Sequence, residues 1–476
     1  MSTSRFLPTD EIARIISHEN LQIHHMELCD VFASILSCRR KLFAILALMG
    51  RPYMIVKLIC EGIVDDDLPF DQDQESRTLR CRDKKRTVES LVITKDQWHL
   101  EDFNSFFTTQ WQFLAPRFGM GCPCVVPAKV EFGHKNFRSM FVLPFTKSSA
   151  VTDSDFESIC NSIVRKVHIH PAHMTRCPRI IGAEVPYAAK IIDAGGLATL
   201  ARSEIEHLRR FDGEENGKRL VQLLFSFEYQ ARFCLIFQWA DGNLMQFWQH
   251  DGSQPRGYSL ARWVAREMLG LAQGLDLIHN SPPRKQGDLS TKGRHGDIKP
   301  ENILWFNSDG KDGNDYDYDG DGDGDGRHHQ LPTQVLKFCD FGLADFHTQA
   351  SVSKVPSQSI GMTQSYRAPE CETHPNITQA YDLWSLGCVL LQFVTWYMQG
   401  WDGVDAFSIS RMGGSLHEVL GWHVSEDTFF HLITQDFKKK PIDHPAVKKA
   451  SSTHPLPSCP VLLALIGLAA PVNTFL

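Results

Sequence analysis

The sequence lacks an uninterrupted apolar segment long enough to cross a lipid bilayer, which takes about 20 apolar residues in a helix. Its longest apolar stretch, residues 41–60, is broken by Arg51, Pro52 and Lys57 and is predicted to form two packed helices. The apolar stretch near the C-terminus is shorter and contains Pro471. We therefore expect no membrane-spanning helix.

The sequence also lacks an excess of basic charge. It has 49 Lys and Arg against 56 Asp and Glu, which gives a net charge of −7. Residues 309–326 contain eight Asp and one Lys and carry a charge of −7 by themselves, so the rest of the chain is close to neutral. This balance does not indicate general attraction to nucleic acid or to an acidic membrane.

Cysteine is too sparse for a disulfide framework, with 13 in 476 residues. Cys122 and Cys124 have no second pair to complete a zinc site. The cluster of His168, His170 and His173 is more typical of a solvated turn at a strand end than of a metal site. No secretory signal is predicted at the start of the sequence. We expect an intracellular protein, cytoplasmic or nuclear, with mostly buried thiols.

An acidic insert suggests a calcium-binding loop, because Asp alternates with Gly and Tyr from Asp315 onward. Such a loop needs a bidentate carboxylate at its twelfth position. Counting from Asp315, the twelfth residue is Gly326, and the registers that begin at Asp317, Asp319 and Asp321 supply no carboxylate either. Neighbouring aspartates repel one another and glycines bury no surface, so residues 307–333 are predicted to form a disordered surface loop.

Hydrophobic periodicity divides the chain into three parts. Residues 1–150 are predicted to form a mostly helical accessory region with no chemical motif. Residues 155–240 contain short β-branched runs around one helix, which predicts a small β-rich lobe. Residues 241–476 are predicted to form a larger helical lobe, with long helices over residues 258–279 and 381–398. The predicted fold class is α+β, with two lobes and a helical N-terminal extension.

Several chemical motifs follow one another between residues 155 and 410. They are "PYAAKII", "LIFQWADGNL", "HGDIKPENILWF", "CDFGLADF" and "APE" followed by "DLWSLGC". In this order they resemble the eukaryotic serine/threonine protein kinase family, and most of all a divergent group of kinase-domain proteins from filamentous fungi. The resemblance implies a bilobal fold that transfers a phosphoryl group from ATP, with Mg²⁺, to Ser or Thr of a protein substrate.

The resemblance also implies roles for the residues of the catalytic loop. Asp297 matches the aspartate that orients the acceptor hydroxyl and takes its proton, and Lys299 would neutralise charge on the transferred group. Asn302 and Asp340 match the Mg²⁺ ligands, whose hard oxygens suit that ion. Thr363 matches the threonine that ties the peptide-binding loop to the catalytic loop.

An ATP-binding set follows in the same way. Lys190 matches the strand lysine that reaches the α- and β-phosphates, and Glu204 matches the helix glutamate that pairs with it. The resemblance implies that the remaining residues contact the adenine. Val164 and Ala188 would lie above it and Leu304 below it. The hinge would bond to the adenine edge through the backbone of three residues: Gln238, Trp239 and Ala240.

Two other functions remain open at this point. Small-molecule kinases of the aminoglycoside and choline types often carry a similar "HGD" triplet, although Lys299, Thr363 and Glu370 of "APE" favour a protein acceptor. A pseudokinase that binds ATP without catalysis is the second. Ile159 and Ser162 stand where the first two glycines of the phosphate loop belong, and bulkier residues there would weaken ATP binding.

Two departures from the family pattern concern arginine. Gly296 stands where most protein kinases carry an Arg that pairs with a phosphorylated activation loop. Its absence makes an on-switch less expected at the four serines of that loop: Ser351, Ser353, Ser357 and Ser359. The last Arg of the sequence, Arg411, is too early to pair with Glu370 as a late Arg does in the family.

Overall fold

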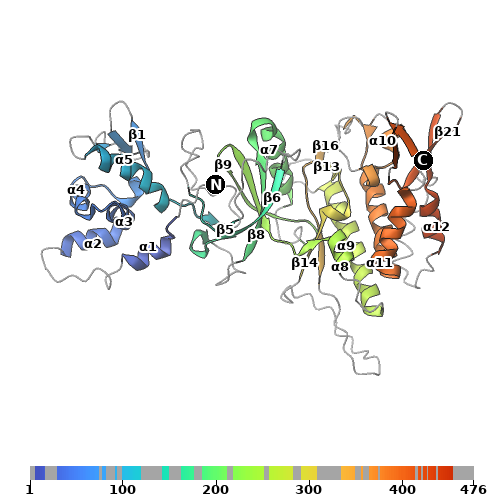
Figure 1. Cartoon of the computed structure of the whole chain (residues 1–476), viewed down its shortest axis with the longest axis horizontal. Helices are drawn as coiled ribbons and strands as arrows, with labels where there is room; N and C mark the ends of the chain where they lie inside the picture. Colours follow the sequence, from blue (N-terminus) through green and yellow to red (C-terminus); the bar gives the residue numbers. More distant parts are fainter. Residues whose placement is uncertain are drawn as a thin grey trace, which may run out of the picture. The chain divides into compact units, whose positions relative to one another are not determined.

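The structure, a computed structural model, describes residues 6–16, 29–73, 78–81, 92–93, 99–119, 142–148, 162–175, 185–211, 218–250, 257–281, 291–307, 334–348, 355–356, 364–373, 376–412, 416–419, 422–425, 427–435 and 438–453. The chain forms two compact units. The first comprises Met1–Ala198 and Leu224–Trp239, and the second comprises Thr199–Leu223 and Ala240–Leu476. Figure 1 labels the elements of both.

The N-terminal part of the first unit is mostly helical, as predicted. Its helices are α1 (Thr9–Ile15), α2 (Cys29–Cys38), α3 (Arg40–Leu48), α4 (Ile55–Cys60) and α5 (Leu100–Thr109), with short 3-10 turns η2 (Pro52–Met54), η3 (Asp65–Asp67) and η4 (Gln110–Phe113). The two helices predicted within residues 41–60 are confirmed as α3 and α4. A small antiparallel sheet, β1 (Phe70–Asp73), β2 (Thr78–Cys81) and β3 (Val92–Ile93), was not predicted, because its strands are short and largely polar.

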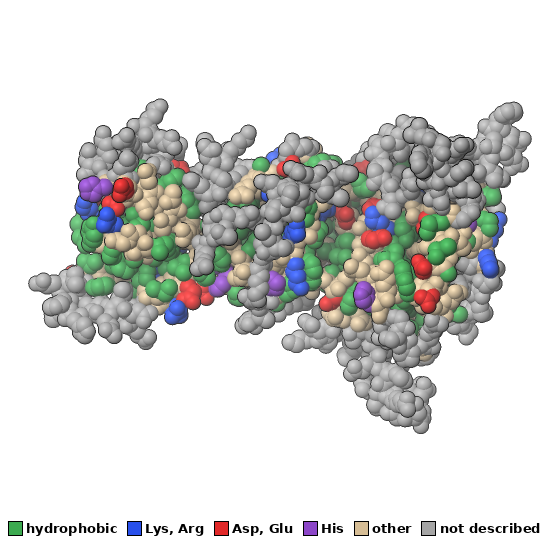
Figure 2. All heavy atoms as spheres, viewed as in Figure 1, with side chains coloured by type: hydrophobic (Ala, Val, Ile, Leu, Met, Phe, Trp, Pro, Cys, Tyr) green, Lys and Arg blue, Asp and Glu red, His purple; other side chains and the backbone are tan. Residues whose placement is uncertain are grey.

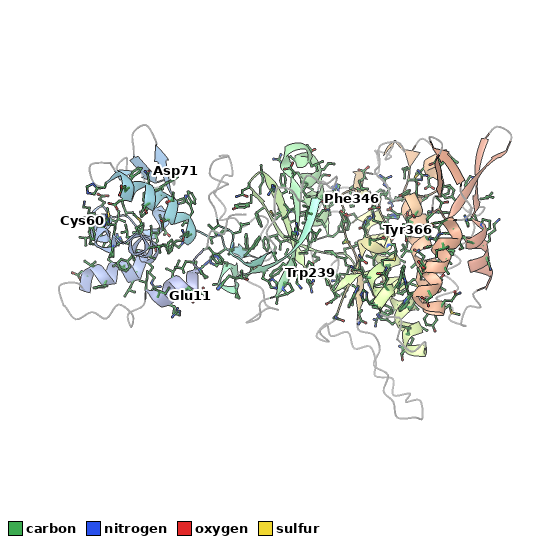
Figure 3. The ribbon with its side chains drawn as sticks, viewed as in Figure 1. Glu11, Cys60, Asp71, Trp239, Phe346 and Tyr366 are labelled. Carbon is green, nitrogen blue, oxygen red and sulfur yellow. The ribbon has the colours of Figure 1, made fainter. Side chains whose placement is uncertain are left out.

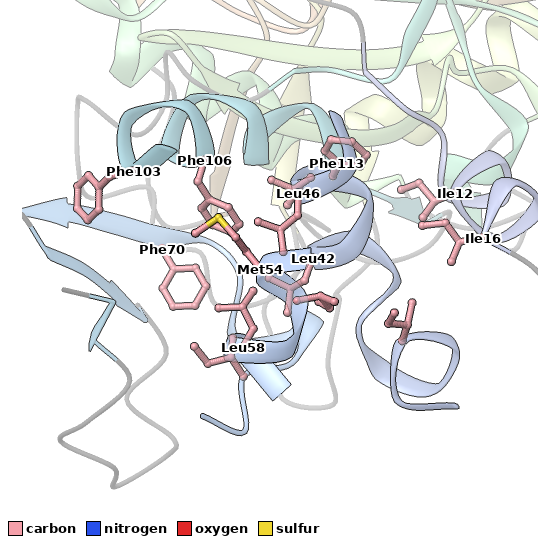
Figure 4. Close-up of a cluster of buried hydrophobic side chains, with 14 residues drawn as sticks. Ile12, Ile16, Leu42, Leu46, Met54, Leu58, Phe70, Phe103, Phe106 and Phe113 are labelled. Atoms are coloured by element: carbon pink, nitrogen blue, oxygen red, sulfur yellow. The ribbon is translucent and has the colours of Figure 1, made fainter. Parts of the chain in front are cut away.

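One apolar core holds these helices together. On α3, Leu42, Ile45 and Leu46 recur at helical spacing and are fully buried. Figure 4 shows Leu42 and Leu46 among aromatic side chains from β1 and α5. The start of α3 is fixed by a carboxylate distant in sequence. Asp65 accepts hydrogen bonds from the backbone N–H groups of Lys41 and Leu42, each at 2.9 Å. A carboxylate at the N-terminus of a helix accepts hydrogen bonds from N–H groups that have no acceptor within the helix. Its negative charge also interacts favourably with the positive end of the helix dipole.

A five-stranded sheet follows in the first unit, in the order β5-β6-β8-β10-β9. Its strands are β5 (Phe145–Ser148), β6 (Ser162–Ile169), β8 (Pro186–Asp193), β9 (Leu223–Tyr229) and β10 (Arg232–Gln238). The strands expected in residues 155–240 are present. The sheet also includes β5, so it begins before residue 155, where the sequence placed the start of this lobe.

One face of this sheet packs on a residue from the N-terminal region. Phe118 stacks on Phe225 and Phe227 of β9, with ring centroids 4.6 Å and 5.4 Å away. Its short strand β4 (Phe118–Gly119) runs parallel to β7 (Met174–Thr175). Val167 and Tyr187 are buried in the same core. The end of the N-terminal region is therefore part of the core of the sheet.

The histidine cluster forms a strand-end turn, as expected, but the expectation that it is solvated was wrong for His173. This side chain ends the turn η6 (Pro171–His173) and is 0% exposed. Its Nδ1 donates to the carbonyl of Pro116 at 2.9 Å, and its Nε2 accepts from the backbone N–H of Thr9 at 3.3 Å. Phe6 packs edge-on against the ring at 5.5 Å. Contacts from residues distant in sequence exclude water here.

We expect acid to loosen α1 through His173. Burial lowers the pKa of this side chain below its ordinary 6.5, with smaller lowering effects from His170 and Arg117 and opposing ones from the Pro116 carbonyl and Asp10. Above pH 6.5 the ring is neutral in both the folded and unfolded chain. As pH falls below that value, the unfolded chain binds a proton that the folded chain does not, so stability decreases until the lower folded pKa is reached.

Hydrogen–deuterium exchange of peptides covering α1, corrected for intrinsic rates, measures this effect at pH 8.0 and 5.5. Exchange should be faster at the lower pH in the wild-type chain. The increase should be absent in His173→Gln, which can still form hydrogen bonds but does not titrate. An equal increase in both proteins would show that another group is responsible.

The second unit is mainly helical. Its helices are α7 (Ala194–Arg210, which begins in the first unit), α8 (Leu244–His250), α9 (Tyr258–His279), α10 (Glu370–Thr373), α11 (Ala380–Met412) and α12 (Pro445–Thr453). The two predicted long helices are confirmed as α9 and α11. The second continues beyond residue 398 and is interrupted at Gly400, where φ is 77°. Trp248, Trp263, Phe393 and Trp396 pack together between α8, α9 and α11.

Short strands connect these helices. They are β11 (Gly242–Asn243), β12 (Asn280–Ser281), β13 (Thr291–Arg294), β14 (Ile303–Phe306), β15 (Val335–Phe338), β16 (Asp345–Thr348), β17 (Val355–Pro356), β18 (Asn376–Ile377), β19 (Leu416–Val419), β20 (Trp422–Ser425), β21 (Phe430–Gln435) and β22 (Lys438–Asp443). Two 3-10 turns, η8 (Pro300–Asn302) and η10 (Gln364–Tyr366), complete the unit.

Within the described part of the chain, no helix is both long and apolar enough to span a membrane. Figure 2 shows one face of the molecule. On this face the described Lys and Arg side chains are scattered among Asp and Glu, so they make no continuous basic surface there.

Candidate active site

The loop that carries the predicted catalytic residues is anchored on both sides by strand pairing. Before it, β13 pairs with β16. After it, β14 pairs with β11 and β15, with Ile303 opposite Phe338. Because Asp340 follows β15 by two residues, these pairings hold it close to the end of the loop. Residues far apart in sequence are thereby brought to one site.

Three predicted residues contact one another within the loop. The Lys299 Nζ lies 2.8 Å from Oδ2 of Asp297. Asn302 donates from Nδ2 to the same Oδ2 at 2.8 Å and to the backbone carbonyl of Asp297 at 2.9 Å. These bonds fix the Asp297 carboxylate and leave the amide oxygen of Asn302 as the atom suited to a cation.

Asp382, at the start of α11, holds the backbone of this loop. The side chain is 0% exposed. Its Oδ2 accepts from the N–H of His295 at 2.7 Å and from Nε2 of His279 at 3.0 Å, and its Oδ1 accepts from the N–H of Gly296 at 2.9 Å. His295 and Gly296 directly precede Asp297 in the sequence. The buried carboxylate of Asp382 therefore fixes the backbone position of the predicted catalytic residue. The resemblance of "DLWSLGC" to the kinase family implies this role for Asp382.

Two further supports were missed in the sequence. His279 ends α9 and donates to Asp382. Gln379 donates from Nε2 to the carbonyls of His279 and Gly293, each at 2.8 Å. Gln379 lies three residues before Asp382, next to the start of the same helix. This position in the sequence could have indicated that Gln379 also supports the catalytic loop. Nothing in the sequence around His279 indicates that Asp382 is its hydrogen-bond partner.

His295 connects the loop to the segment that carries Asp340. Its Nδ1 accepts from the N–H of Asp297 at 3.3 Å and its Nε2 lies 3.0 Å from the carbonyl of Cys339. Together these bonds require the tautomer protonated at Nε2. The N–H of Cys339 donates to the carbonyl of Asn302 at 3.0 Å. Asn302 is thus bonded to the residue that precedes Asp340.

Asn302 and Asp340 fit a magnesium site. Asp340 is exposed and has a φ of 64°, a conformation that non-glycine residues rarely adopt. Among the described residues, no group of three or more His, Cys, Asp or Glu could hold a metal ion. Mg²⁺ typically takes only one or two protein ligands and completes its shell with water and phosphate oxygens. One amide oxygen and one carboxylate suit that ion.

The predicted nucleotide residues of the first unit share one face of its sheet. Val164 lies opposite Lys190, and Lys166 lies opposite Ala188, in the pairing of β6 with β8. Side chains alternate along a strand, so these residues face away from the core that contains Tyr187. Val164 is 59% exposed. A strand that alternates in this way leaves an open face on which Lys190 can meet a ligand.

The predicted hinge lies where the two units join along the chain. Gln238 ends β10 and pairs with Tyr187. Trp239, labelled in Figure 3, is the last residue of the first unit, and Ala240 is the first of the second. The ammonium group of Lys166 lies 5.0 Å from the centre of the Trp239 ring. This cation–π contact, worth about 0.5–1 kcal/mol at an exposed site, ties the end of β10 to β6.

The structure describes the positions of some of the other predicted residues and not of others. Glu204 is 5% exposed on α7, and Leu304 lies on β14 opposite Lys337. The pairing of Glu204 with Lys190 stays a prediction. Thr363, Ile159 and the insert 308–333 lie outside the described residues, while Ser162 is the first residue of β6.

A comparison with protein families identifies the chain. The family model described as protein kinase domain matches residues 182–443, more than half of the sequence. The chain belongs to the protein kinase family. The five-stranded sheet and the mainly helical second unit correspond to the two lobes of the kinase fold, as predicted.

Individual kinases are similar over a smaller region. Dual specificity protein kinase CLK4 of Mus musculus is 27% identical over 209 residues, which cover 43% of this chain and 38% of that protein. Dual specificity protein kinase CLK1 of Homo sapiens is 29% identical over 196 residues, 40% of this chain and 35% of that protein. Serine/threonine-protein kinase TIO of Arabidopsis thaliana is 30% identical over 191 residues, 40% of this chain and 11% of that protein.

The chain therefore matches less than half the length of each of these relatives. All three are named as protein kinases, and neither they nor the family model support the small-molecule alternative. Being animal and plant proteins, they do not test the resemblance to filamentous-fungal kinases.

Gly296 suits this kinase loop for a backbone reason. Its φ is 84°, a left-handed conformation that disfavours residues with a Cβ by about 1–2 kcal/mol. A Cβ placed here would lie 2.7 Å from the carbonyl oxygen of Leu343, closer than real contacts allow. Glycine removes both problems while its N–H still bonds to Asp382. The loss of the family arginine therefore leaves the geometry around Asp297 intact.

Proposed function

We propose that the protein transfers the γ-phosphoryl group of ATP to Ser or Thr hydroxyls of protein substrates, inside the cell. The observation that carries the proposal is the contact network of Asp297, Lys299 and Asn302. Asp382 accepts hydrogen bonds from the backbone just before Asp297, and the chain belongs to the protein kinase family. Each member of the network matches a step that phosphoryl transfer needs.

The acceptor hydroxyl would hydrogen-bond to the carboxylate of Asp297. As the hydroxyl oxygen bonds to the γ-phosphorus, the bond from that phosphorus to the β,γ-bridging oxygen breaks and ADP leaves. The proton of the hydroxyl passes to the Asp297 carboxylate. Lys299, whose Nζ is 2.8 Å from Oδ2, would offset negative charge on the transferred group. The bond from Asn302 Nδ2 to the same oxygen keeps the carboxylate from rotating away. Positioning and charge compensation are the main catalytic contributions in this reaction.

Nucleotide-binding roles are proposed for the other predicted residues. Mg²⁺, when bound, neutralises charge on the phosphates, and Asn302 and Asp340 would hold it. Lys190, supported by Glu204, would bind the α- and β-phosphates. Contacts to the adenine are proposed for Val164, Ala188 and Leu304, and for the backbone of Gln238, Trp239 and Ala240. Thr363 would connect the peptide-binding segment to the catalytic loop.

Replacing Asp297 with Ala tests the proposal. The full chain and the variant are incubated with Mg-ATP and generic protein substrates such as casein and myelin basic protein, and incorporation of labelled phosphate is measured. We expect roughly a 100-fold to 10,000-fold loss, the range for removal of a positioned general base. Phosphoamino-acid analysis should show phosphoserine and phosphothreonine.

Asp402→Ala is a matched control, because Asp402 is exposed on α11 of the same unit. It should retain full activity. Equal background incorporation by the wild type and Asp297→Ala would refute catalysis. ATP binding measured on the same samples would then distinguish a pseudokinase, which binds nucleotide, from a protein that does not.

A further inference from the structure

Tyr366, labelled in Figure 3, is a buried residue three positions after Thr363 of the predicted peptide-binding loop. It ends the turn η10, and the helix α10 follows it; we call residues 364–373 the acceptor segment. Burial raises the pKa of the Tyr366 hydroxyl, and the carboxylate of Glu301 in the catalytic loop raises it further. Tyr366 therefore lies where the acceptor segment approaches the catalytic loop.

Helix α11 holds Tyr366 at two points. The Tyr366 hydroxyl donates a hydrogen bond to Oε1 of Gln392 at 2.8 Å. The backbone carbonyl of Tyr366 accepts a hydrogen bond from the hydroxyl of Ser385 at 2.9 Å. Gln392 and Ser385 are both buried, so bulk water does not compete for these bonds. The side chain and the backbone of Tyr366 are thus bonded to the same helix, which begins beside the catalytic loop at Asp382.

A stack of aromatic rings and one guanidinium group supports the Tyr366 ring. The ring centre of Phe429 lies 5.8 Å from that of Tyr366. The guanidinium carbon of Arg411 lies 4.0 Å from the centre of the Phe429 ring and 4.3 Å from that of Phe407. The Phe407 and Phe429 rings also meet edge to face at 5.9 Å. We call Phe407, Arg411 and Phe429 the Arg411 stack; all three are buried.

The Arg411 stack is held in place by an ion pair and by the backbone. The carboxylate of Asp427 accepts hydrogen bonds from Nε and Nη2 of Arg411, at 2.7 Å and 3.0 Å. Two parallel bonds of this kind fix the plane of a guanidinium group. The backbone carbonyl of Phe429 accepts from the N–H of His444 at 3.1 Å. The Phe429 ring is therefore positioned both through Arg411 and through its own backbone.

These contacts come from the part of the chain that departs from the family pattern. In that pattern a late Arg pairs with Glu370 of the acceptor segment, and this sequence has no Arg late enough. Asp427 and Phe429 lie beyond the end of α11 at Met412. Residues that follow α11 thus support the acceptor segment at Tyr366, four residues before Glu370.

We propose that Phe429 and Gln392 are positioning residues for the protein acceptor and act through Tyr366. They keep the acceptor segment in one conformation beside the catalytic loop. A binding segment that is ordered in advance loses less conformational entropy when its ligand binds, so loosening it weakens binding of the acceptor. The proposal rests on the proposed function, because it concerns the acceptor of that reaction.

Three variants of the full chain test this role by steady-state kinetics. Tyr366→Phe removes the hydroxyl, Gln392→Leu removes its hydrogen-bond acceptor, and Phe429→Leu removes the supporting ring. Initial rates at varied Mg-ATP and varied myelin basic protein give a KM for each substrate. The KM for the protein should rise roughly threefold to tenfold, the equivalent of one lost hydrogen bond, and the KM for ATP should change by less than about twofold.

Two controls separate positioning from stability. A residue that only stabilises the fold changes the amount of active protein, so its loss lowers the apparent kcat and leaves both KM values unchanged. Asp402→Ala, an exposed change on the same helix, should have wild-type constants. The double variant Tyr366→Phe, Gln392→Leu should raise the KM for the protein no more than the more severe single variant, because both changes remove the same bond.

Hydrogen–deuterium exchange tests the positioning without any activity. Peptides covering residues 364–373 should exchange faster in Tyr366→Phe and Phe429→Leu than in the wild type. Peptides covering α9 should exchange equally in all three proteins, which shows that the variants are folded. Unchanged exchange of residues 364–373 would overturn the proposal.

The kinetic results can also overturn it. An unchanged KM for the protein in all three variants, or equal rises in both KM values, would show that these residues do not act on the acceptor. A wild type without phosphoryl transfer would refute the proposed function and the acceptor role together. Faster exchange in the variants would then still show that the Arg411 stack and Gln392 hold the acceptor segment.

Discussion

Replacing Asp382 with Ala is expected to lower the free energy of unfolding by about 3–5 kcal/mol, the range for removing one partner of a buried charged network. The carboxylate is fully buried and accepts three hydrogen bonds, from His279, His295 and Gly296. Truncation leaves those three donors buried without an acceptor, at roughly 1–3 kcal/mol each where no water enters.

Activity should disappear in the same variant, because the two amides lead directly into Asp297. Urea unfolding followed by tryptophan fluorescence gives the stability change, and phosphate incorporation gives the activity. Asp382→Asn keeps one acceptor oxygen and should be less destabilised than Asp382→Ala. Asp402→Ala, an exposed carboxylate on the same helix, should unfold like the wild type. A loss below about 1 kcal/mol for Asp382→Ala would contradict the role given to this carboxylate.

Replacing Arg411 with Leu is expected to be of similar severity. Arg411 is buried, and its Nε and Nη2 atoms form hydrogen bonds. Its Nη1 has no hydrogen-bond partner among the described residues. The guanidinium group contacts both carboxylate oxygens of Asp427, at 2.7 Å from Nε and 3.0 Å from Nη2. The guanidinium carbon also lies 4.3 Å from the ring centre of Phe407 and 4.0 Å from that of Phe429.

Breaking this pair should cost at most about 3–5 kcal/mol, the range for a fully buried pair, because the Asp427 side chain is 23% exposed. Two rings also lose a cation between them. Urea unfolding of Arg411→Leu and of the wild type measures the loss. Lysine at 411 should recover little stability, since it cannot bond to both oxygens from one planar group. A loss below about 1 kcal/mol for Arg411→Leu, as for an exposed ion pair, would contradict the importance of its bonds to Asp427.

The sequence predicted the elements whose pattern is local. The strands β6, β8, β9 and β10 follow from short β-branched and apolar runs, and α9 and α11 from long apolar helical patterns. The catalytic loop was predictable for a similar reason. Asp297, Lys299 and Asn302 lie within six residues, so a short turn suffices to bring their side chains together. The order of the motifs then indicated the family, which the family model confirms.

Local pattern failed where the strands are short and polar or where pairing is between distant segments. The sheet β1-β2-β3 has no alternation that would reveal it, and β5 joins the central sheet across residues that carry no strand signal. His173 looked like a solvated turn residue, but its burial depends on Phe6, Thr9 and Pro116. Nothing near His173 in the sequence reports contacts that the chain makes with its own N-terminal region.

By itself, then, the sequence determined the family, the order of elements and the residues of the catalytic loop, because each depends on spacing within a few turns or strands. The partners of the buried charges were decided by the tertiary structure. Arg411 comes too early in the sequence to pair with Glu370, and the structure pairs it with Asp427. Burial and pairing of a charge depend on which distant segments fold against it, and no local pattern records that.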